Sequence, residues 1–546
     1  MANAMQAGVS GLQVHQTMLD VAGNNLANVN TYGYKSSRVS FAELLSETMR
    51  EATPPAAAGG GTNPLQIGAG VSLASIDRNM GQGTLTFTGQ PLDMAIEGNG
   101  FFTLNDGAKD VFTRVGAFAV DANYNLVDPA TGFRVQRTGN EGVAVGFQSS
   151  ASSNIRIPYD VPLPAKATEK IVFAGNLSAD SASPTTSLLT SGIVYTEDSG
   201  TVATRDTLMT DLDQAQSLTP GETIRIHGTD ATGASIDTSF AIQATSTVGD
   251  LLDAITAAFP GSTATLSNGE VRLTDNQAGY SQADLYLDYS GAGTLELPEY
   301  FKLLQVGAEE ARNTNVEIFD AQGISHVLAI TFARTTQPST WDAVLASTTG
   351  EAVMDSAGRR VKDITFARDG SFAGMGGTTP DTSAFQVTFG ANPQTVNLSL
   401  GTEGKFDGLS QFGGPSTAAA SSQDGYEAGY LSSLSVSREG VLVGMFTNGV
   451  RQDVAALKVT TFLNPTGLLS SGNGYYAASA NSGDPVSTKA LAGAAGAITG
   501  GSLEKSNVDM ASEFVGLIQA QNGYQANART IRVATDMIRE LANLIR

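Results

Sequence analysis

The chain is 546 residues long and has a net charge of −22, from 31 Lys+Arg against 53 Asp+Glu. This acidity argues against a strong nucleic-acid binder, because the protein would repel phosphate backbones and anionic membranes. The chain contains no cysteine, which excludes disulfides, thiolate metal sites and a cysteine nucleophile. At this length we expect several domains.

The N-terminal segment has no features of a targeting signal, since it lacks both a basic region and a continuous apolar run. The small-residue stretch 490–501 is too short and too rich in glycine to span a bilayer, which takes about 20 apolar residues. We therefore expect no membrane insertion. Export, if it occurs, would not depend on a cleaved signal peptide.

The charge is concentrated away from the two ends of the chain. Residues 1–30 carry one acid and no base, and residues 503–546 carry five acids and five bases. By contrast, residues 186–312 hold 18 acids and five bases, a net charge of −13. This division suggests that the ends perform one task and the middle another.

Both ends are predicted to be helical, over residues 1–30 and 503–546, because apolar side chains recur there every seven residues. These rows are typical of a coiled-coil surface that binds a partner. The rows comprise Met5, Leu12, Leu19 and Leu26 at one end, and Leu503, Met510, Leu517, Tyr524, Ile531, Ile538 and Ile545 at the other, with Phe514 beginning a weaker second row. Ser502 or Ser506 is expected to cap the second helix, with Asp509 in its first turn. The alternative is two amphipathic helices packed on their own domain, although no apolar core adjoins either one in sequence.

After the first helix, residues 31–70 are predicted to form a short helix and a flexible linker. Ser40 and Glu43 match a capping box, and an apolar stripe follows over 40–52. Residues 53–64 are rich in proline, alanine and glycine, and predict a flexible break.

From residue 71 onward, alternating apolar residues separated by glycine, asparagine and aspartate turns predict strands and hairpins. Among them are hairpins with turns at 438–440, 448–449 and 268–269, and one over 224–242. Residues 71–150 and 405–502 are predicted to be two parts of one inner β domain. Between them, 151–185 and 313–404 would form an outer β domain, with a nested acidic α+β module at 186–312. The helix of this module is predicted after Ser246 and Thr247, where apolar residues over 248–259 have helical spacing. The predicted fold class is α+β, mainly β, with coiled-coil-forming terminal helices.

Motifs for catalysis or cofactor binding are absent from the sequence. The nucleotide-binding, zinc-protease and serine-hydrolase signatures do not occur. His15, His227 and His326 lie in segments assigned to different domains, which argues against a histidine metal site or triad. Paired carboxylates of a polysaccharide-acting enzyme stay open as an alternative, but we expect no enzyme, no cofactor and no metal.

The two ends carry motifs that resemble the signatures of bacterial flagellar rod and hook proteins. The N-terminal motif comprises Asn24, Asn25, Leu26, Ala27 and Asn28, followed by Tyr32, Gly33 and Lys35. The C-terminal motif comprises Ser506, Asn507, Val508 and Asp509, followed by a run at 518–528. Both motifs occur in order at the extreme ends of the chain, so the resemblance is specific.

Within that family the resemblance favours the hook branch over the shorter distal rod branch, because this chain carries a large insertion. It implies an extracellular part of the flagellum that assembles with copies of itself into a flexible helical tube and transmits torque. It also implies contacts with rod, hook-cap and hook–filament junction proteins and with the export apparatus. The alternatives from other classes are a secreted adhesin and the polysaccharide-acting enzyme.

Overall fold

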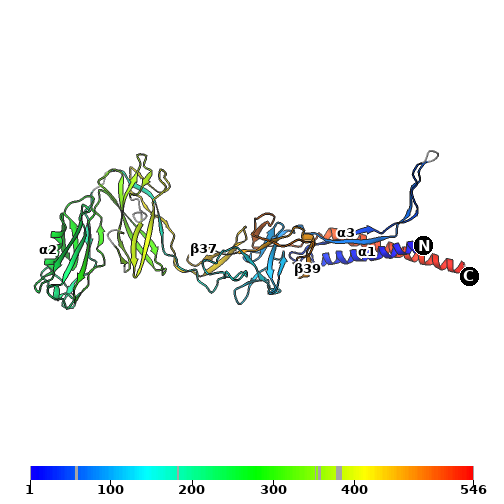
Figure 1. The fold of residues 1–546 in the computed structure, drawn as a ribbon, viewed down its shortest axis with the longest axis horizontal. Helices are drawn as coiled ribbons and strands as arrows, with labels where there is room; N and C mark the ends of the chain where they lie inside the picture. Colours follow the sequence, from blue (N-terminus) through cyan, green and yellow to red (C-terminus); the bar gives the residue numbers. More distant parts are fainter. Residues whose placement is uncertain are drawn as a thin grey trace. The chain divides into compact units, whose positions relative to one another are not determined.

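The computed structural model describes residues 2–544 apart from 56–59, 181–183, 351, 355–357 and 377–383. The chain divides into two compact units: unit 1 is Met1–Leu163 with Gly429–Arg546, and unit 2 is Pro164–Ala428. The helices of the described residues are α1 (Ala2–Ala27), α2 (Val248–Ala258) and α3 (Met510–Leu544), and strands make up most of the rest. This confirms the predicted class, a mainly β protein with helices at both ends (Figure 1).

The acidity belongs almost entirely to unit 2. This unit holds 13 Lys+Arg against 32 Asp+Glu, a net charge of −19, which leaves −3 for unit 1. Unit 1, which contains both chain ends, is therefore nearly neutral.

The sheets of unit 1 are built from both ends of the chain. The strand pairs β5 with β43, β6 with β42 and β7 with β38 each join a segment that precedes unit 2 in sequence to one that follows it. The strands before the insertion are β5 (Leu85–Phe87), β6 (Met94–Glu97), β7 (Phe101–Asn105), β8 (Asp110–Thr113), β9 (Ala119–Val120), β10 (Leu126–Val127), β11 (Arg134–Val135) and β12 (Arg137–Thr138). Those after it are β35 (Leu431–Val436), β36 (Val441–Phe446), β37 (Arg451–Leu457), β38 (Val459–Thr461), β39 (Leu469–Gly472), β40 (Tyr475–Ala477), β41 (Val486–Thr488), β42 (Ala497–Gly500) and β43 (Ser502–Glu504).

The largest sheet of unit 1 runs in the order β39-β40-β8-β7-β11-β10-β9, with β38 on β7 and β41 on β38. Its core includes edge-to-face aromatic contacts of Phe462 with Phe101 and Phe112, at centroid distances of 5.8 and 4.8 Å. A second sheet, β12-β37-β36-β35, contains the hairpins predicted around 438–440 and 448–449, which are confirmed. Both sheets require residues from before and after the insertion.

The short helix predicted over 40–52 is wrong. The segment instead forms β1 (Ser37–Glu43), which pairs with β4 (Val71–Arg78), and β2 (Glu47–Arg50), which pairs with β3 (Leu65–Ile67). Phe41, Leu45 and Met49 are 43%, 91% and 62% exposed, so the apolar stripe has no core within the subunit against which a helix would pack. Non-local pairing therefore overrides the local capping-box signal. Part of the predicted flexible linker, 56–59, lies outside the described residues.

Two sheets of unit 2 enclose a core that includes the buried Trp341. One sheet runs β28-β31-β32-β13-β33 with β34 on β13, and the other β25-β26-β27-β29-β30. Their strands are β13 (Lys170–Ser178), β25 (Ala311–Phe319), β26 (Ser325–Arg334), β27 (Thr340–Thr348), β28 (Ala352–Val353), β29 (Arg360–Phe366), β30 (Phe372–Gly374), β31 (Ala384–Phe389), β32 (Asn392–Ser399), β33 (Leu409–Phe412) and β34 (Ala419–Gln423).

The rest of unit 2 is a nested module whose ends meet, since Thr185 N donates to Ala308 O at 2.9 Å. The predicted helix is α2, which begins with a capping box between Thr247 and Asp250. The strands are β14 (Leu188–Thr190), β15 (Thr196–Glu197), β16 (Thr201–Val202), β17 (Ala215–Gln216), β18 (Thr223–Thr229), β19 (Ser235–Ala241), β20 (Ser262–Ser267), β21 (Glu270–Asp275), β22 (Asp284–Ser290), β23 (Thr294–Leu295) and β24 (Lys302–Gln305). The hairpins β18–β19 and β20–β21 match the prediction.

Glu222 is expected to make the nested module sensitive to acid. Its carboxylate accepts hydrogen bonds from Tyr289 Oη at 2.6 Å and from the amides of Thr219, Ala292 and Gly293 at 2.9–3.1 Å. These bonds, with that of Tyr289 foremost, lower the pKa of Glu222 from 4.5 to about 2. Because the folded pKa lies below the unfolded one, the stabilisation is complete above about pH 4.5 and is lost as the pH falls towards 2.

Hydrogen exchange of the Ala292 and Gly293 amides should therefore accelerate as the pH falls through this window, beyond the intrinsic change in exchange rate. In Glu222→Gln the additional pH dependence should disappear. The exposed Glu299→Gln is the matched control and should behave as the wild type. Equal pH dependence in all three proteins would contradict the assignment.

Candidate assembly site at the paired chain ends

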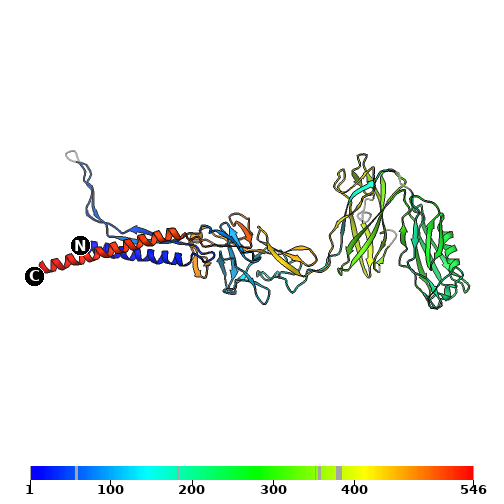
Figure 2. The same ribbon diagram turned by 180° about the vertical axis from the view of Figure 1, so that it is seen from behind.

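Helices α1 and α3 lie side by side and antiparallel in unit 1 (Figures 1 and 2). Glycines form the closest part of this contact. A Cβ added at Gly8 would lie 2.9 Å from Ile531 Cγ1, and one at Gly11 would lie 2.7 Å from the Asn527 side chain. Further along, a Cβ at Gly523 would overlap the His15 ring. The backbones approach closely because these positions have no side chain.

Asn25 joins the end of α1 to the first strand and to α3. Its side chain is buried, with Oδ1 accepting from Ser37 N at 2.9 Å and Tyr34 Oη at 3.1 Å. Its Nδ2 donates to Ser37 O at 2.8 Å and to Glu513 Oε1 at 2.9 Å. Burial raises the pKa of Glu513, and the bond from Asn25 opposes that shift. One residue of the N-terminal motif thus fixes three elements.

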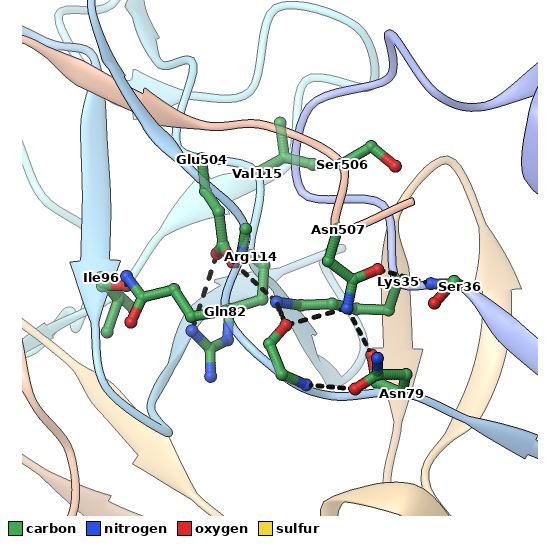
Figure 3. A network of polar contacts seen from close by, with 12 residues as sticks. Lys35, Ser36, Asn79, Gln82, Ile96, Arg114, Val115, Glu504, Ser506 and Asn507 are labelled. Carbon is green, nitrogen blue, oxygen red and sulfur yellow. Dashed lines mark hydrogen bonds and ion pairs between the residues drawn. The ribbon is translucent and has the colours of Figure 1, made fainter. Parts of the chain in front are cut away.

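Lys35 and Glu504 form a buried ion pair between the two ends of the chain (Figure 3). Lys35 Nζ lies 2.7 Å from Glu504 Oε1 and also donates to Gly81 O at 2.8 Å. Glu504 Oε1 accepts from Gly83 N at 2.7 Å, and Glu504 Oε2 lies 3.7 Å from Arg114 NH1. Lys35, Arg114 and Glu504 are at most 2% exposed. We call these three residues the buried triad.

The triad places two cations around one carboxylate in a buried site. Burial lowers the pKa of Lys35 and of Arg114, while Glu504 counteracts both shifts. Arg114 also lies over the Phe101 ring at 4.8 Å. Glu504 is therefore the single counter-charge for both cations among the ion pairs of the described residues.

Asn507 of the C-terminal motif completes the junction. Its Oδ1 accepts from Ser36 N at 2.8 Å, and its Nδ2 donates to Asn79 O at 2.8 Å and to Gly81 O at 2.9 Å (Figure 3). Gly33 adopts φ +66° and donates its N–H to Glu504 O at 2.8 Å. The two motifs are therefore joined at one place in the fold, although they come from opposite ends of the chain.

The remaining polar motif residues make hydrogen bonds to residues close to them in sequence. Asp509 Oδ1 accepts from Ala511 N at 2.9 Å and so caps α3, rather than lying within its first turn. Ser506 Oγ accepts from Val508 N at 3.3 Å before the helix begins, so neither Ser502 nor Ser506 is the cap. Asn28 Nδ2 donates to Asn24 O at 2.9 Å just after α1 ends, and Tyr32 is exposed.

The heptad rows do not lie on a single buried face. Leu503 is not helical, because it lies in β43, where it is buried against β5. The half-buried members are Met5, Leu12, Leu19 and Leu26 of α1, and Leu517 and Ile531 of α3. The exposed members are Met510, Phe514, Tyr524 and Ile538. Ile545 lies outside the described residues.

This spread has a geometric cause, since a straight helix rotates a seven-residue row by about 20° per heptad. The face of α3 that meets α1 includes Ile531 of the row and the small residues Ala520, Gly523 and Ala534, of which Ala520 and Ala534 are buried. Small residues spaced by three or four positions are the sequence signal for this contact.

Apolar side chains of α3 are exposed along much of the helix. They are Met510, Phe514, Val515, Ile518, Val533, Met537, Ile538 and Leu541, each between 43% and 58% exposed. Exposed apolar surface of this extent marks an interaction site. The paired helices therefore bury part of their surface within the subunit and leave these apolar side chains exposed.

The described residues hold no cluster of three or more His, Asp or Glu side chains able to bind a metal. His15, His227 and His326 lie in α1, β18 and β26 respectively. Within the described part of the chain, every helix is too short or too polar to cross a bilayer.

Four family models match the chain, in an order that follows its architecture. They are "Flagella basal body rod protein" over residues 5–35, "Flagellar hook protein FlgE/F/G D1 domain" over 95–175, "Flagellar basal body protein FlaE D2 domain" over 294–426 and "Flagellar basal body rod FlgEFG protein C-terminal" over 499–544. The two terminal matches include all of the motif residues.

Several relatives match this chain over all or nearly all of their own length. The flagellar hook proteins FlgE of Borreliella burgdorferi and Treponema pallidum are each 32% identical to this chain, with all of both chains covered. The Escherichia coli hook protein is 27% identical over 99% of this chain and 100% of its own. The crystal structure of Helicobacter pylori FlgE2 matches with a TM-score of 0.37 at 15% identity, over 73% of this chain and 96% of that one, which is too distant to compare individual elements. The identity and coverage of the full-length relatives show that the chain belongs to the flagellar hook protein FlgE family.

Proposed function

We propose that this chain is the structural subunit of a bacterial flagellar hook, and that copies of it assemble into a flexible helical tube that transmits torque from the rod to the filament. The observation that carries this proposal is the exposed apolar surface of α3 beside its glycine-lined contact with α1. A subunit with such a surface gains stability when copies cover it. No enzymatic role is proposed.

We propose that the two units have different roles in the tube, in accordance with their different net charges. The helices of nearly neutral unit 1 would line the tube, and unit 2, with its net charge of −19, would form the solvated exterior. We propose the finer division predicted from the sequence: a terminal helical domain, an inner β domain, an outer β domain and the nested module. Bending would then come from sliding at polar contacts between domains of neighbouring subunits.

The names of the relatives support a place in the flagellum outside the cell. We propose that the chain is exported without a cleaved signal peptide, and that it contacts rod, hook-cap and junction proteins at the ends of the tube. The terminal helices would be only partly ordered in the free subunit and would order fully on assembly. Slow hydrogen exchange throughout α1 and α3 of the monomer would contradict this last point.

Removing the helices is the direct test of the function. A variant lacking 2–30 and 510–546 keeps Leu503 and Glu504 in β43. We expect electron microscopy to show tubes for the full chain under polymerising conditions and none for this variant. Fluorescence of Trp341, the single tryptophan, should remain that of a buried indole, because its core lies in unit 2. Tubes formed by the shortened chain would refute the role of the helices.

A further inference from the structure

A cavity of about 490 Å³ lies in unit 1 beside the end of the helix pair where α3 begins. Met18 and Val21 of α1 and Val39 of β1 give it apolar walls. Arg38 and Asp77 lie at its polar rim. A water molecule takes about 30 Å³ in the liquid, so the cavity volume is many times that of one water molecule. The cavity therefore has room for more than one aliphatic side chain.

The opposite end of the helix pair has apolar side chains without a partner in the subunit. Ala534 is the last buried residue of α3, and every described side chain over 535–543 is exposed. Met537, Ile538 and Leu541 are 52%, 43% and 44% exposed. Leu541 lies four residues after Met537 and three after Ile538, so it shares one helix face with both of them. The last turns of α3 thus present a compact apolar knob.

We propose that the knob of one subunit, centred on Ile538 and Leu541, docks into the α1–β1–α3 cavity of a second copy of this chain. The inference rests on the proposed function and names the partner for one end of the helix pair. The cavity and the knob are different surfaces at opposite ends of the same helices. Contacts of this heterologous kind extend without limit unless they close into a ring, and so generate helical polymers.

Both surfaces also carry charges of both signs, so each charged group of the knob can meet an opposite charge in the cavity. The cavity is lined by Arg38 and Arg78 as well as by Asp77 and Glu513, and Asn25 Nδ2 donates to Glu513 Oε1. The last turns of α3 carry Glu540 and the negative end of the helix dipole, which the two arginines would attract. Arg539 of the same turns offers a cation to Asp77. The apolar knob would therefore enter with its charged neighbours facing opposite charges.

Cross-linking tests the proposal in the full chain, which has no cysteine of its own. The double variant Val39→Cys/Leu541→Cys, oxidised under polymerising conditions, should give a ladder of covalent oligomers. A mixture of the two single variants should give dimers that contain one chain of each. The matched control Val39→Cys/Asn543→Cys should give no ladder, because position 543 lies on the other side of the helix.

A second pair, Val21→Cys/Ile538→Cys, guards against loss of assembly caused by one substitution, and should give the same ladder. Tubes without cross-links in both pairs would overturn the docking while leaving the proposed function intact. Dimers of the Leu541→Cys single variant alone would also overturn it, because they would show knobs meeting knobs. Failure of the wild-type chain to form tubes would instead count against the proposed function.

Discussion

Replacing Glu504 by glutamine should lower the free energy of unfolding of unit 1 by about 3–5 kcal/mol, the usual cost of breaking a buried ion pair. The substitution keeps the size of the side chain and an oxygen that can accept from Gly83 N. It removes the charge that lies 2.7 Å from Lys35 Nζ and 3.7 Å from Arg114 NH1. Two buried cations would then face each other without a counter-charge.

The loss can be assigned to unit 1 because the two units have separate probes. Chemical denaturation followed by circular dichroism reports mainly on α1 and α3, the two long helices of unit 1. Trp341 fluorescence reports on unit 2, and its transition should not move. A shift of both transitions by the same amount would contradict the local origin of the effect.

Two further substitutions calibrate the result. Lys35→Met should cost less than Glu504→Gln, because Glu504 keeps Arg114 and the bond from Gly83 N. Lys489→Met breaks an ion pair with Glu141 in which the lysine side chain is 48% exposed. Such an exposed pair contributes less than about 1 kcal/mol. Equal losses in all three variants would show that burial of the triad has no special cost.

Local sequence patterns predicted the elements that depend on neighbours in the chain. The alternation at 441–445 and the turn at 448–449 define the hairpin of β36 and β37, two strands that follow each other directly in the chain. Likewise Thr247 and Asp250 form the capping box of α2 within a single helical turn. Signals of this kind are complete within a short window, so one sequence is enough to read them.

The features that local patterns did not predict join residues that lie far apart in the chain. Phe41 and its neighbours have the spacing of an apolar helical stripe. However, they lie in β1, which pairs with β4, and β2, β3 and their connecting segment separate these two strands in sequence. The triad joins Lys35 to Glu504 at the other end of the chain, and Arg114 is not part of either motif. Pairing over such distances leaves no periodicity or spacing in the sequence. The resemblance indicated which motifs matter, and the geometry supplied the reason.

The sequence predicted the helices α1 and α3, but neither their pairing with each other nor the residues in closest contact. The heptad rows predicted both helices, and the lack of an adjoining apolar core in sequence suggested that the helices need partners from outside. Their first partner is the other end of the same chain, where Gly8 meets Ile531 and Gly11 meets Asn527. Heptad counting emphasised large apolar residues, whereas the closest contact depends on residues with no side chain. The large residues at Phe514 and Ile538 remain exposed for a second contact.

Alanine at Gly11 should therefore destabilise the helix pair, whereas alanine at Gly23 of the same helix should stabilise it. Glycine costs a helix about 1 kcal/mol relative to alanine, so both substitutions gain the same intrinsic term. At Gly23 the added methyl group meets no atom within 4 Å. At Gly11 it lies 2.7 Å from three atoms of the Asn527 side chain, which must move or push the helices apart. Overpacking of this kind costs about 1–3 kcal/mol.

The larger variant Gly11→Leu should separate α1 from α3 and abolish tube formation, while Gly23→Ala should assemble as the wild type does. Thermal unfolding followed by circular dichroism measures the stability, and electron microscopy measures the assembly. The double variant Gly11→Ala/Asn527→Ala removes the obstructing side chain and should recover most of the stability lost in Gly11→Ala. If Gly11→Ala were as stable as Gly23→Ala, the close approach of the helices would be wrong. If Gly11→Leu still formed tubes, pairing within the subunit would not be needed for assembly.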